Sequence, residues 1–171
     1  MTPRLRGVGH QLARDYPAAI AAYREALELR RSLSPESEDV AISLSDIAEV
    51  ERLTGDLASA ERDRREALRI AKAVGFQEGV GNFTGNLAGL ALDREDWAVA
   101  ERLSREALTL TEKIGRKELI AANCSCLAKA LTRQGRKPEA LPYARRAVDI
   151  CAELRSPDLD YARGVLRGCQ S

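Results

Sequence analysis

The sequence has few aromatic residues and almost no net charge. Aromatic side chains make up 4% of its 171 residues, so a folded core has to be built mainly from Ala, Leu, Val and Ile. The 27 Lys and Arg residues nearly balance the 26 Asp and Glu residues, which leaves a formal net charge of +1. Non-specific nucleic-acid binding depends on a strongly basic field, and this sequence lacks one. We therefore expect no nucleic-acid partner.

Long apolar runs are also missing. No stretch of about 18 apolar residues occurs, which predicts no membrane-spanning helix, and the first residues lack the apolar centre of a signal peptide. The four cysteines lie in helical patterns of the C-terminal third. Cys124 and Cys126 are two positions apart, so they point to different sides of a helix and neither bridge nor share a metal easily. We expect small buried side chains in the reducing environment of a cytoplasmic protein, with no metal or other cofactor.

The residues that usually carry catalysis are scarce as well. The only histidine is His10, which lies in a segment with weak helix signals, so a histidine relay is implausible. The glycines at 79, 81, 85 and 89 fall within a helical pattern, without the Lys-Ser/Thr pair that follows a phosphate-binding loop. The sequence therefore predicts a protein that is not an enzyme and has no catalytic residues.

The sequence does contain a pattern that recurs at a fixed period. Its copies open at Asp15, Asp56, Asp96 and Arg136, with spacings of 41, 40 and 40 residues. Each copy has an alanine four positions after its opening residue, then a charged residue, an alanine and an aliphatic residue from the tenth position onward. A fixed period of this size is typical of stacked helical hairpins.

Helical periodicity, with Gly and Pro between the segments, predicts helices over residues 17–33, 36–54, 56–74, 76–94, 96–114, 116–134 and 137–154. We expect an all-α protein, a right-handed α-α superhelix (solenoid) of antiparallel helical hairpins in a single domain over residues 1–171. The repeat units are approximately 2–34, 35–75, 76–115 and 116–155, followed by a C-terminal capping helix over 157–169. Residues 2–14 are the weakest helix because they contain Gly7 and Gly9. They are either a solvent-facing terminal repeat or the start of a fragment that begins partway into a repeat.

The small residues at fixed places resemble the tetratricopeptide repeat over about residues 15–155. The residues that carry the resemblance in the second helices are Gly55-Asp56-Leu57 with Ala60 and Ala67, and Glu95-Asp96-Trp97 with Ala100 and Ala107. Those in the first helices are Ile47-Ala48, Leu87-Ala88 and Leu127-Ala128. The period exceeds the family's usual length, so the chain is similar to the long-repeat variety found in bacterial signalling proteins and kinesin light chains. The family's bulky aromatic residue is Tyr23 in the first copy but Arg64, Ser104 and Ala144 in the others, which predicts looser packing there.

The resemblance implies a groove lined by the first helices of the hairpins. Its candidate partner-binding residues are Ser45, Glu49, Arg52, Asn82, Gly85, Asn86, Gly89, Asp93, Ser125, Lys129 and Arg133. The leading interpretation is a protein–protein interaction scaffold that binds a peptide or a helix in this groove. The alternatives are a ligand- or peptide-sensing regulatory segment of a larger signalling protein and a self-associating structural scaffold, such as a homodimer. Asp46 and Val8 stand at two positions of the family's clamp for a terminal carboxylate, so that activity is not expected.

Two features leave alternatives open. Gly81, Gly85 and Gly89 lie on one face of a predicted helix, where each glycine costs roughly 0.5–1 kcal/mol relative to alanine. This stripe either allows close packing with neighbouring helices or forms a smooth floor for a partner. The basic cluster near the C-terminus is either a solvated helix face or a patch for an acidic partner. Its members are Arg133, Arg136, Lys137, Arg145 and Arg146.

Overall fold

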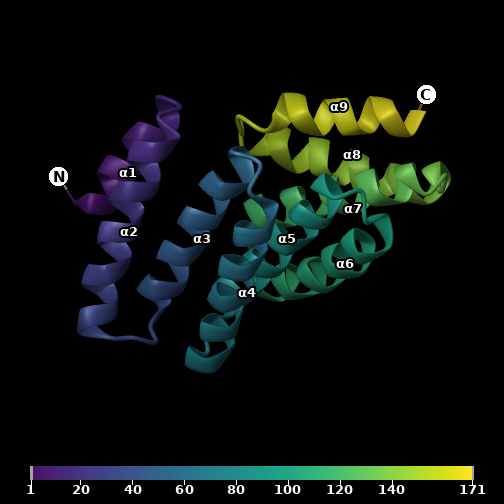
Figure 1. Ribbon diagram of the computed structural model, residues 1–171. Coiled ribbons are helices and arrows are strands. Elements are labelled where there is room, and N and C mark those ends of the chain that lie inside the picture. Colours follow the sequence, from purple (N-terminus) through teal and green to yellow (C-terminus); the bar gives the residue numbers. More distant parts are fainter. Residues whose placement is uncertain (1, 171) are drawn as a thin grey trace. The chain divides into compact units, whose positions relative to one another are not determined.

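The computed structural model describes residues 2–170, which form nine α-helices and no strand (Figure 1). The helices are α1 (Pro3–Leu12), α2 (Tyr16–Leu33), α3 (Glu38–Leu53), α4 (Leu57–Val74), α5 (Gln77–Asp93), α6 (Trp97–Ile114), α7 (Lys117–Arg133), α8 (Lys137–Glu153) and α9 (Leu159–Gln170). The all-α class of helical hairpins expected from the sequence is confirmed. The chain divides into two compact units between Phe83 and Thr84, within α5, and each unit is described by itself. The expected single domain stays a prediction.

The second helix of three hairpins begins in the same way, at an aspartate. The Oδ1 atoms of Asp15, Asp56 and Asp96 accept hydrogen bonds from backbone N–H groups three residues later, over 3.2, 3.1 and 3.1 Å. An aspartate in this place satisfies a backbone donor that has no partner within the helix. The repeated Asp of the sequence is therefore the N-cap of α2, α4 and α6.

The turn before each second helix contains one residue in the left-handed region. Gly55 and Gly135 hold it with φ of +87° and +77°, and Glu95 holds the corresponding place with φ of +60°. Glycine adopts this conformation without a steric penalty, whereas a residue with a Cβ atom does not. The turns before α2 and α6, where Arg14 (φ of +59°) and Glu95 hold this place, are therefore the strained copies of a shared turn.

In the first unit, α1 packs against α2, while α3 packs against both α2 and α4 (Figure 1). Residues that are almost fully buried form its core. They are Tyr23, Val40, Leu44, Ile47, Val50 and Ile70. A Cβ atom at Gly7 would lie 2.5 Å from the ring of Tyr23, so this glycine lets α1 approach α2 closely. Close packing therefore explains Gly7, one of the two glycines that weaken the helix signal of residues 2–14.

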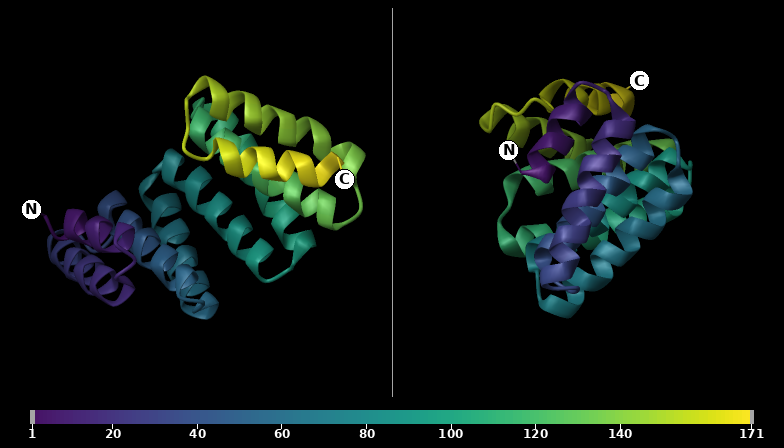
Figure 2. Two further views of the ribbon diagram at one scale, coloured as in Figure 1. Left: turned by 90° about the horizontal axis from the view of Figure 1, so that it is seen from above. Right: turned by 60° about the vertical axis from the view of Figure 1, so that its left-hand side comes forward.

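In the second unit, α7 packs against α6, α8 and α9, and α9 runs along α8 (Figure 2). The largest cluster combines buried residues of these helices, among them Leu127, Leu131, Ala144, Cys151 and Ala162. Val165 and Leu166 of α9 pack against the cluster from its edge. The last helix therefore covers the final hairpin, as a capping helix is expected to do.

The alanines that define the repeat are among its most deeply buried residues. Eleven of them are at most 4% exposed, namely Ala19, Ala26, Ala48, Ala60, Ala67, Ala88, Ala100, Ala107, Ala128, Ala140 and Ala147. Arg64, Ser104 and Ala144, which replace the family's aromatic residue, are buried too, at 2%, 0% and 0% exposed. A buried arginine needs a charged partner. The partner of Arg64 is Glu49, one of the predicted groove residues.

Candidate functional site

The first helices α3 and α5 each carry a stripe of half-buried side chains at equivalent positions of the repeat. On α3 the stripe consists of Ile42, Ser45, Asp46 and Glu49, and on α5 it consists of Asn82, Gly85, Asn86 and Gly89. The two sets are 40 positions apart, and their spacing within a helix places each set on one face. Asp93 is exposed at the end of α5. The predicted binding positions on these two helices therefore lie where a partner has access.

A hollow of about 230 Å³ lies beside the α3 stripe in the first unit. Ser45 and Asn82 both line it, so the structure brings these two predicted residues together. Its rim includes the ion pair between Arg4 Nε and Asp46 Oδ2, at 2.6 Å. The pair satisfies the charge of Asp46 within the chain, and Glu78 is the other charged residue of the lining.

Glu49 forms two ion pairs, both inside the first unit. Its Oε1 lies 2.7 Å from Nη2 of Arg52, and its Oε2 lies 2.5 Å from Nη2 of the buried Arg64. Taking a charge out of water is costly unless a partner accompanies it, so Glu49 compensates the charge of Arg64. The predicted binding residue Glu49 therefore also links α3 to α4, while Arg52 pairs with it within α3.

The glycines of α5 differ in their surroundings: some are packed against other residues and one faces open space. Gly81 is buried. A Cβ atom at Gly85 would lie 2.3 Å from Oδ1 of Asn123, a residue of α7 that is only 3% exposed. A Cβ atom at Gly89 would meet nothing within 4 Å. Gly85 therefore serves close packing of α5 on α7, whereas Gly89 leaves open space on the stripe.

On α7, two of the three predicted residues line a larger hollow. We call it the basic pocket, and its lining residues are Lys129, Thr132, Arg133, Lys137, Tyr161, Gly164, Val165 and Gly168. Its volume is about 630 Å³, within the usual range of about 300–1,000 Å³ for ligand sites. It lies between the C-terminal part of α7, the start of α8 and one face of α9. The third predicted residue of α7, Ser125, is only 3% exposed. The expectation that Ser125 faces the groove is therefore wrong, because helix packing buries it.

Arg133 is held at the rim of the basic pocket by an aromatic ring. Its guanidinium carbon lies 5.7 Å from the centroid of the Trp97 ring, which belongs to α6. A guanidinium over an indole face is attracted by the ring quadrupole, and an arginine placed in this way keeps its charge available to a further ligand. The contact orients Arg133 without neutralising it.

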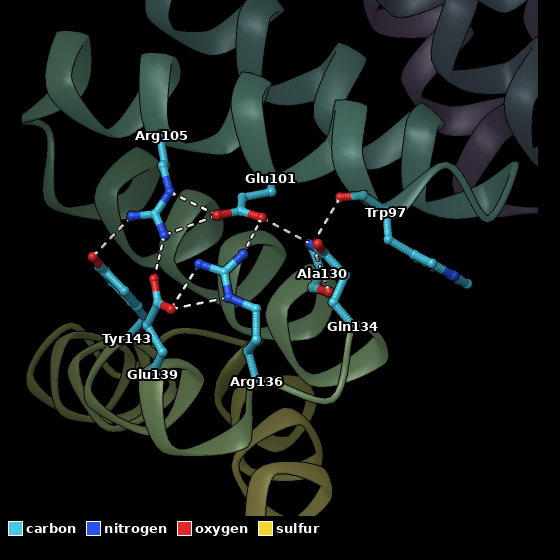
Figure 3. A network of polar contacts seen from close by, with 8 residues as sticks. All are labelled: Trp97, Glu101, Arg105, Ala130, Gln134, Arg136, Glu139 and Tyr143. Atoms are coloured by element: carbon cyan, nitrogen blue, oxygen red, sulfur yellow. Dashed lines mark hydrogen bonds and ion pairs between the residues drawn. The ribbon is translucent and has the colours of Figure 1, made fainter.

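In a polar network on α6 and α8, by contrast, the arginines are paired with carboxylates (Figure 3). The carboxylate of Glu101 accepts hydrogen bonds from Arg105, Gln134 and Arg136 over 2.9, 2.9 and 2.7 Å. Glu139 accepts from Arg105 and Arg136, each over 2.6 Å. Burial alone would raise the pKa of Glu101, but the hydrogen bonds from these three donors outweigh it, so the pKa is lowered. The charges of the network satisfy one another and stabilise the stacking of α6 and α8.

The basic cluster predicted from the sequence is therefore not one surface. Arg136 belongs to the polar network, and Arg146 is paired with Glu112 on α6. Arg133 and Lys137 line the basic pocket instead. Sequence reasoning missed the contribution of α9, whose Gly164 and Gly168 keep one wall of the pocket free of side chains. Their spacing of four residues was the available signal, since it places both on one helix face.

Within residues 2–170, no group of three or more His, Cys, Asp or Glu side chains is arranged to hold a metal ion. No helix of that part of the chain is both long and apolar enough to cross a membrane. Burial raises the pKa of the Cys124 thiol to about 11, which keeps it protonated at neutral pH. The expectation that the protein is not an enzyme stays a prediction.

Stacked helical hairpins with accessible first-helix stripes define a class of helical repeat proteins. Residues 2–73 and 80–153 match the family model described as tetratricopeptide repeat, which covers most of the chain. The chain therefore belongs to the tetratricopeptide repeat family, as its residue pattern suggested. No curated protein sequence matches it.

Solved structures show the same fold at low sequence identity. BtubC (BKLC) from P. vanneervenii is 21% identical with a TM-score of 0.76, and the match covers 96% of this chain and 72% of that one. The TPR-like repeats of a putative kinesin light chain from Podosopora anserina are 17% identical with a TM-score of 0.74, covering 98% and 84%. A Rap protein complexed with Competence and Sporulation Factor is 20% identical with a TM-score of 0.83. The match covers 96% of this chain, which spans only 46% of the Rap chain.

Proposed function

We propose that this protein is a protein–protein interaction module that binds a peptide or a helix of a partner on the faces of its first helices. The observation that supports this most directly is that α3 and α5 each carry half-buried side chains at equivalent positions of the repeat. The stripe residues are mostly small or polar, such as Ser45, Asn86 and Gly89. Such side chains let a partner backbone approach closely and offer it hydrogen bonds.

A second candidate is a sensor that takes up a ligand or a peptide as part of a larger signalling protein. The likeness in fold to a Rap protein complexed with Competence and Sporulation Factor favours it. In both candidates the first step is the binding of a ligand to the first-helix faces. The two differ in the consequence of binding, which is assembly in the first case and a change in an attached activity in the second. Self-association, the third interpretation of the sequence, is checked by light scattering across concentration.

Selection from a displayed library of random peptides of about 12 residues tests the proposal. Peptides selected on the unaltered protein are then measured against Gly89→Arg, which fills the open part of the α5 stripe. Gly9→Arg is the matched control, because a Cβ atom at Gly9 also meets nothing within 4 Å. Gly9 is the repeat equivalent of Val50, a buried residue of α3 that is not part of the stripe.

We expect peptides that bind the unaltered protein and Gly9→Arg equally and bind Gly89→Arg at least about tenfold more weakly, with all three proteins equally helical. A selection that yields no binding peptide would count against the proposal. Peptides that bind all three proteins alike would place the interaction away from the α5 stripe.

A further inference from the structure

We propose that the basic pocket is a docking site for an acidic peptide segment, one that brings two or three carboxylates and an apolar side chain. The inference rests on the proposed function, because it names the chemistry of one part of the partner. It goes further in assigning α9 and the start of α8 to the binding surface.

The charge of the pocket is uncompensated. Lys129, Arg133 and Lys137 line it, and no Asp or Glu is among the lining residues. Among the residues that the structure describes, none of the three forms an ion pair with a carboxylate. Several other arginines of the second unit do form such pairs, as Arg105 and Arg136 do with Glu101. Three cations left unpaired around one hollow favour an anionic occupant.

The floor of the pocket is apolar and open. Val165 packs against the core cluster and exposes part of its side chain, and the Tyr161 side chain is 52% exposed. A Cβ atom at Gly168 would meet nothing within 4 Å, and the only atom near one at Gly164 is the Nη2 of Arg167, at 3.7 Å. The absence of side chains at these two glycines leaves room for an apolar group between the cations. A purely ionic ligand would leave this floor in contact with water.

The three cations also have complementary roles. Lys129 and Arg133 are four residues apart on α7, so they point to the same side of the helix. Lys137 is the first residue of α8 and is half-buried. Arg133 is oriented by Trp97 and presents a planar fork suited to a carboxylate, whereas the two lysines act as mobile point charges. This arrangement selects carboxylates presented along a short segment.

The extent of the basic region distinguishes a peptide from a nucleic acid. Nucleic-acid binding uses a basic strip that follows the phosphate backbone over several nucleotides. Here the net charge is only +1, and Arg136, the residue before Lys137, is neutralised by Glu101 and Glu139, while Arg167 adds a further cation beside Gly164. A confined basic pocket with an apolar floor fits an acidic peptide better than a polynucleotide.

The test uses the peptides selected for the proposed function, read for composition and affinity. The pocket variant carries Lys129→Glu, Arg133→Glu and Lys137→Glu. The matched control carries Lys72→Glu, Lys113→Glu and Arg145→Glu, three exposed cations outside the pocket, so both variants change the net charge equally. Circular dichroism verifies that both variants are as helical as the parent. A single-stranded oligothymidylate with the same charge as the peptide is measured in parallel.

We expect the selected peptides to be rich in Asp and Glu around an apolar residue. Their affinity should fall about tenfold or more in the pocket variant and stay near the parent value in the control. Selected peptides that are neutral or basic, or that bind the pocket variant normally, would overturn the inference while leaving the proposed function in place. An oligothymidylate that binds more tightly than the acidic peptide would overturn it as well. A selection that yields no peptide would overturn both.

Discussion

Glu51 is a carboxyl group in a place where the other repeats have apolar side chains. It lies on α3 at the position of Ala91 and Leu131, and it is 4% exposed. Its Oε2 has no hydrogen-bond partner among the described residues. Burial, together with the smaller effect of the nearby carboxylate of Asp63, raises the pKa of Glu51 from 4.5 to about 7. We therefore predict that replacing Glu51 with Gln stabilises the first unit at alkaline pH.

The magnitude follows from linkage between proton binding and folding. Between pH 4.5 and about 7 the folded state binds more protons at Glu51 than the unfolded state, so stability falls as pH rises through this range. The cost is absent below the unfolded pKa and complete above the folded pKa. Because one pKa unit corresponds to about 1.4 kcal/mol, the ionised carboxylate costs roughly 3 kcal/mol at pH 8. Glu51→Gln should recover most of this amount at pH 8 and almost none near pH 4.5.

Other charges face Glu51 from the elements packed against it. Arg62 and Asp63 come from α4, Asp56 from the turn before α4, and Arg24 from α2. Arg62 and Arg24 lower the pKa of Glu51, whereas Asp63 and Asp56 raise it, and burial is the largest influence. Screening these charges with salt should therefore change the pH dependence only slightly.

Urea unfolding at a series of pH values measures the effect. Far-ultraviolet circular dichroism follows the helices of both units, while the fluorescence of the single tryptophan, Trp97, follows the second unit. The gain should appear in the circular dichroism signal. Glu38→Gln is the control, because it makes the same chemical change at an exposed position of α3. A stability change in Glu51→Gln that is equal at pH 5 and pH 8 would refute the assignment of a buried, ionising carboxyl.

Three further predictions concern packing, the turns and the polar network. Gly85→Ala should destabilise the fold by about 1–3 kcal/mol, because the new methyl group meets Asn123. Gly89→Ala should stabilise it by about 0.5–1 kcal/mol. Urea midpoints that shift in the same direction in both variants would contradict this. Glu95→Gly should raise stability by about 0.5–1 kcal/mol through relief of its left-handed conformation, and a lower melting temperature would argue against strain there. Glu101→Gln should cost about 1 kcal/mol in low salt and less in high salt, and a cost unaffected by salt would show that charge is not its cause.

The helices could be predicted from the sequence because local signals recur with the repeat. Asp56 and Asp96 cap helices, Gly75 and Gly115 end them in the left-handed conformation, and Ala at fixed places packs between them. Each signal acts within a few residues of its own position, so a single copy contains the information. Four copies in register then determine the architecture.

The candidate site was predictable only where it depends on helix periodicity. Lys129 and Arg133 line the same hollow, because residues four apart share a helix face, and their role in binding a partner stays a prediction. The burial of Ser125 and the contact of Gly85 with Asn123 depend on how closely two helices approach, and periodicity does not specify that distance. The wall supplied by α9 depends on long-range packing of the last helix on α7 and α8.

Arg64 illustrates a further limit. The family pattern places an aromatic residue there, and its replacement suggested looser packing. The structure instead buries Arg64 and pairs it with Glu49, whose own position suggested partner binding. The two departures from the pattern compensate each other, but they are 15 residues apart and on different helices. Single-sequence reasoning had no means of joining them.

Hydrogen exchange with and without a saturating acidic peptide from the selection tests the central claim most directly. The account predicts that the peptide slows amide exchange in the C-terminal half of α7, at the start of α8 and along α9, where the basic pocket is lined. Exchange in α6, which carries Glu101 and Arg105 of the polar network, should not change. Protection confined to α6, with none in α7 or α9, would contradict the account.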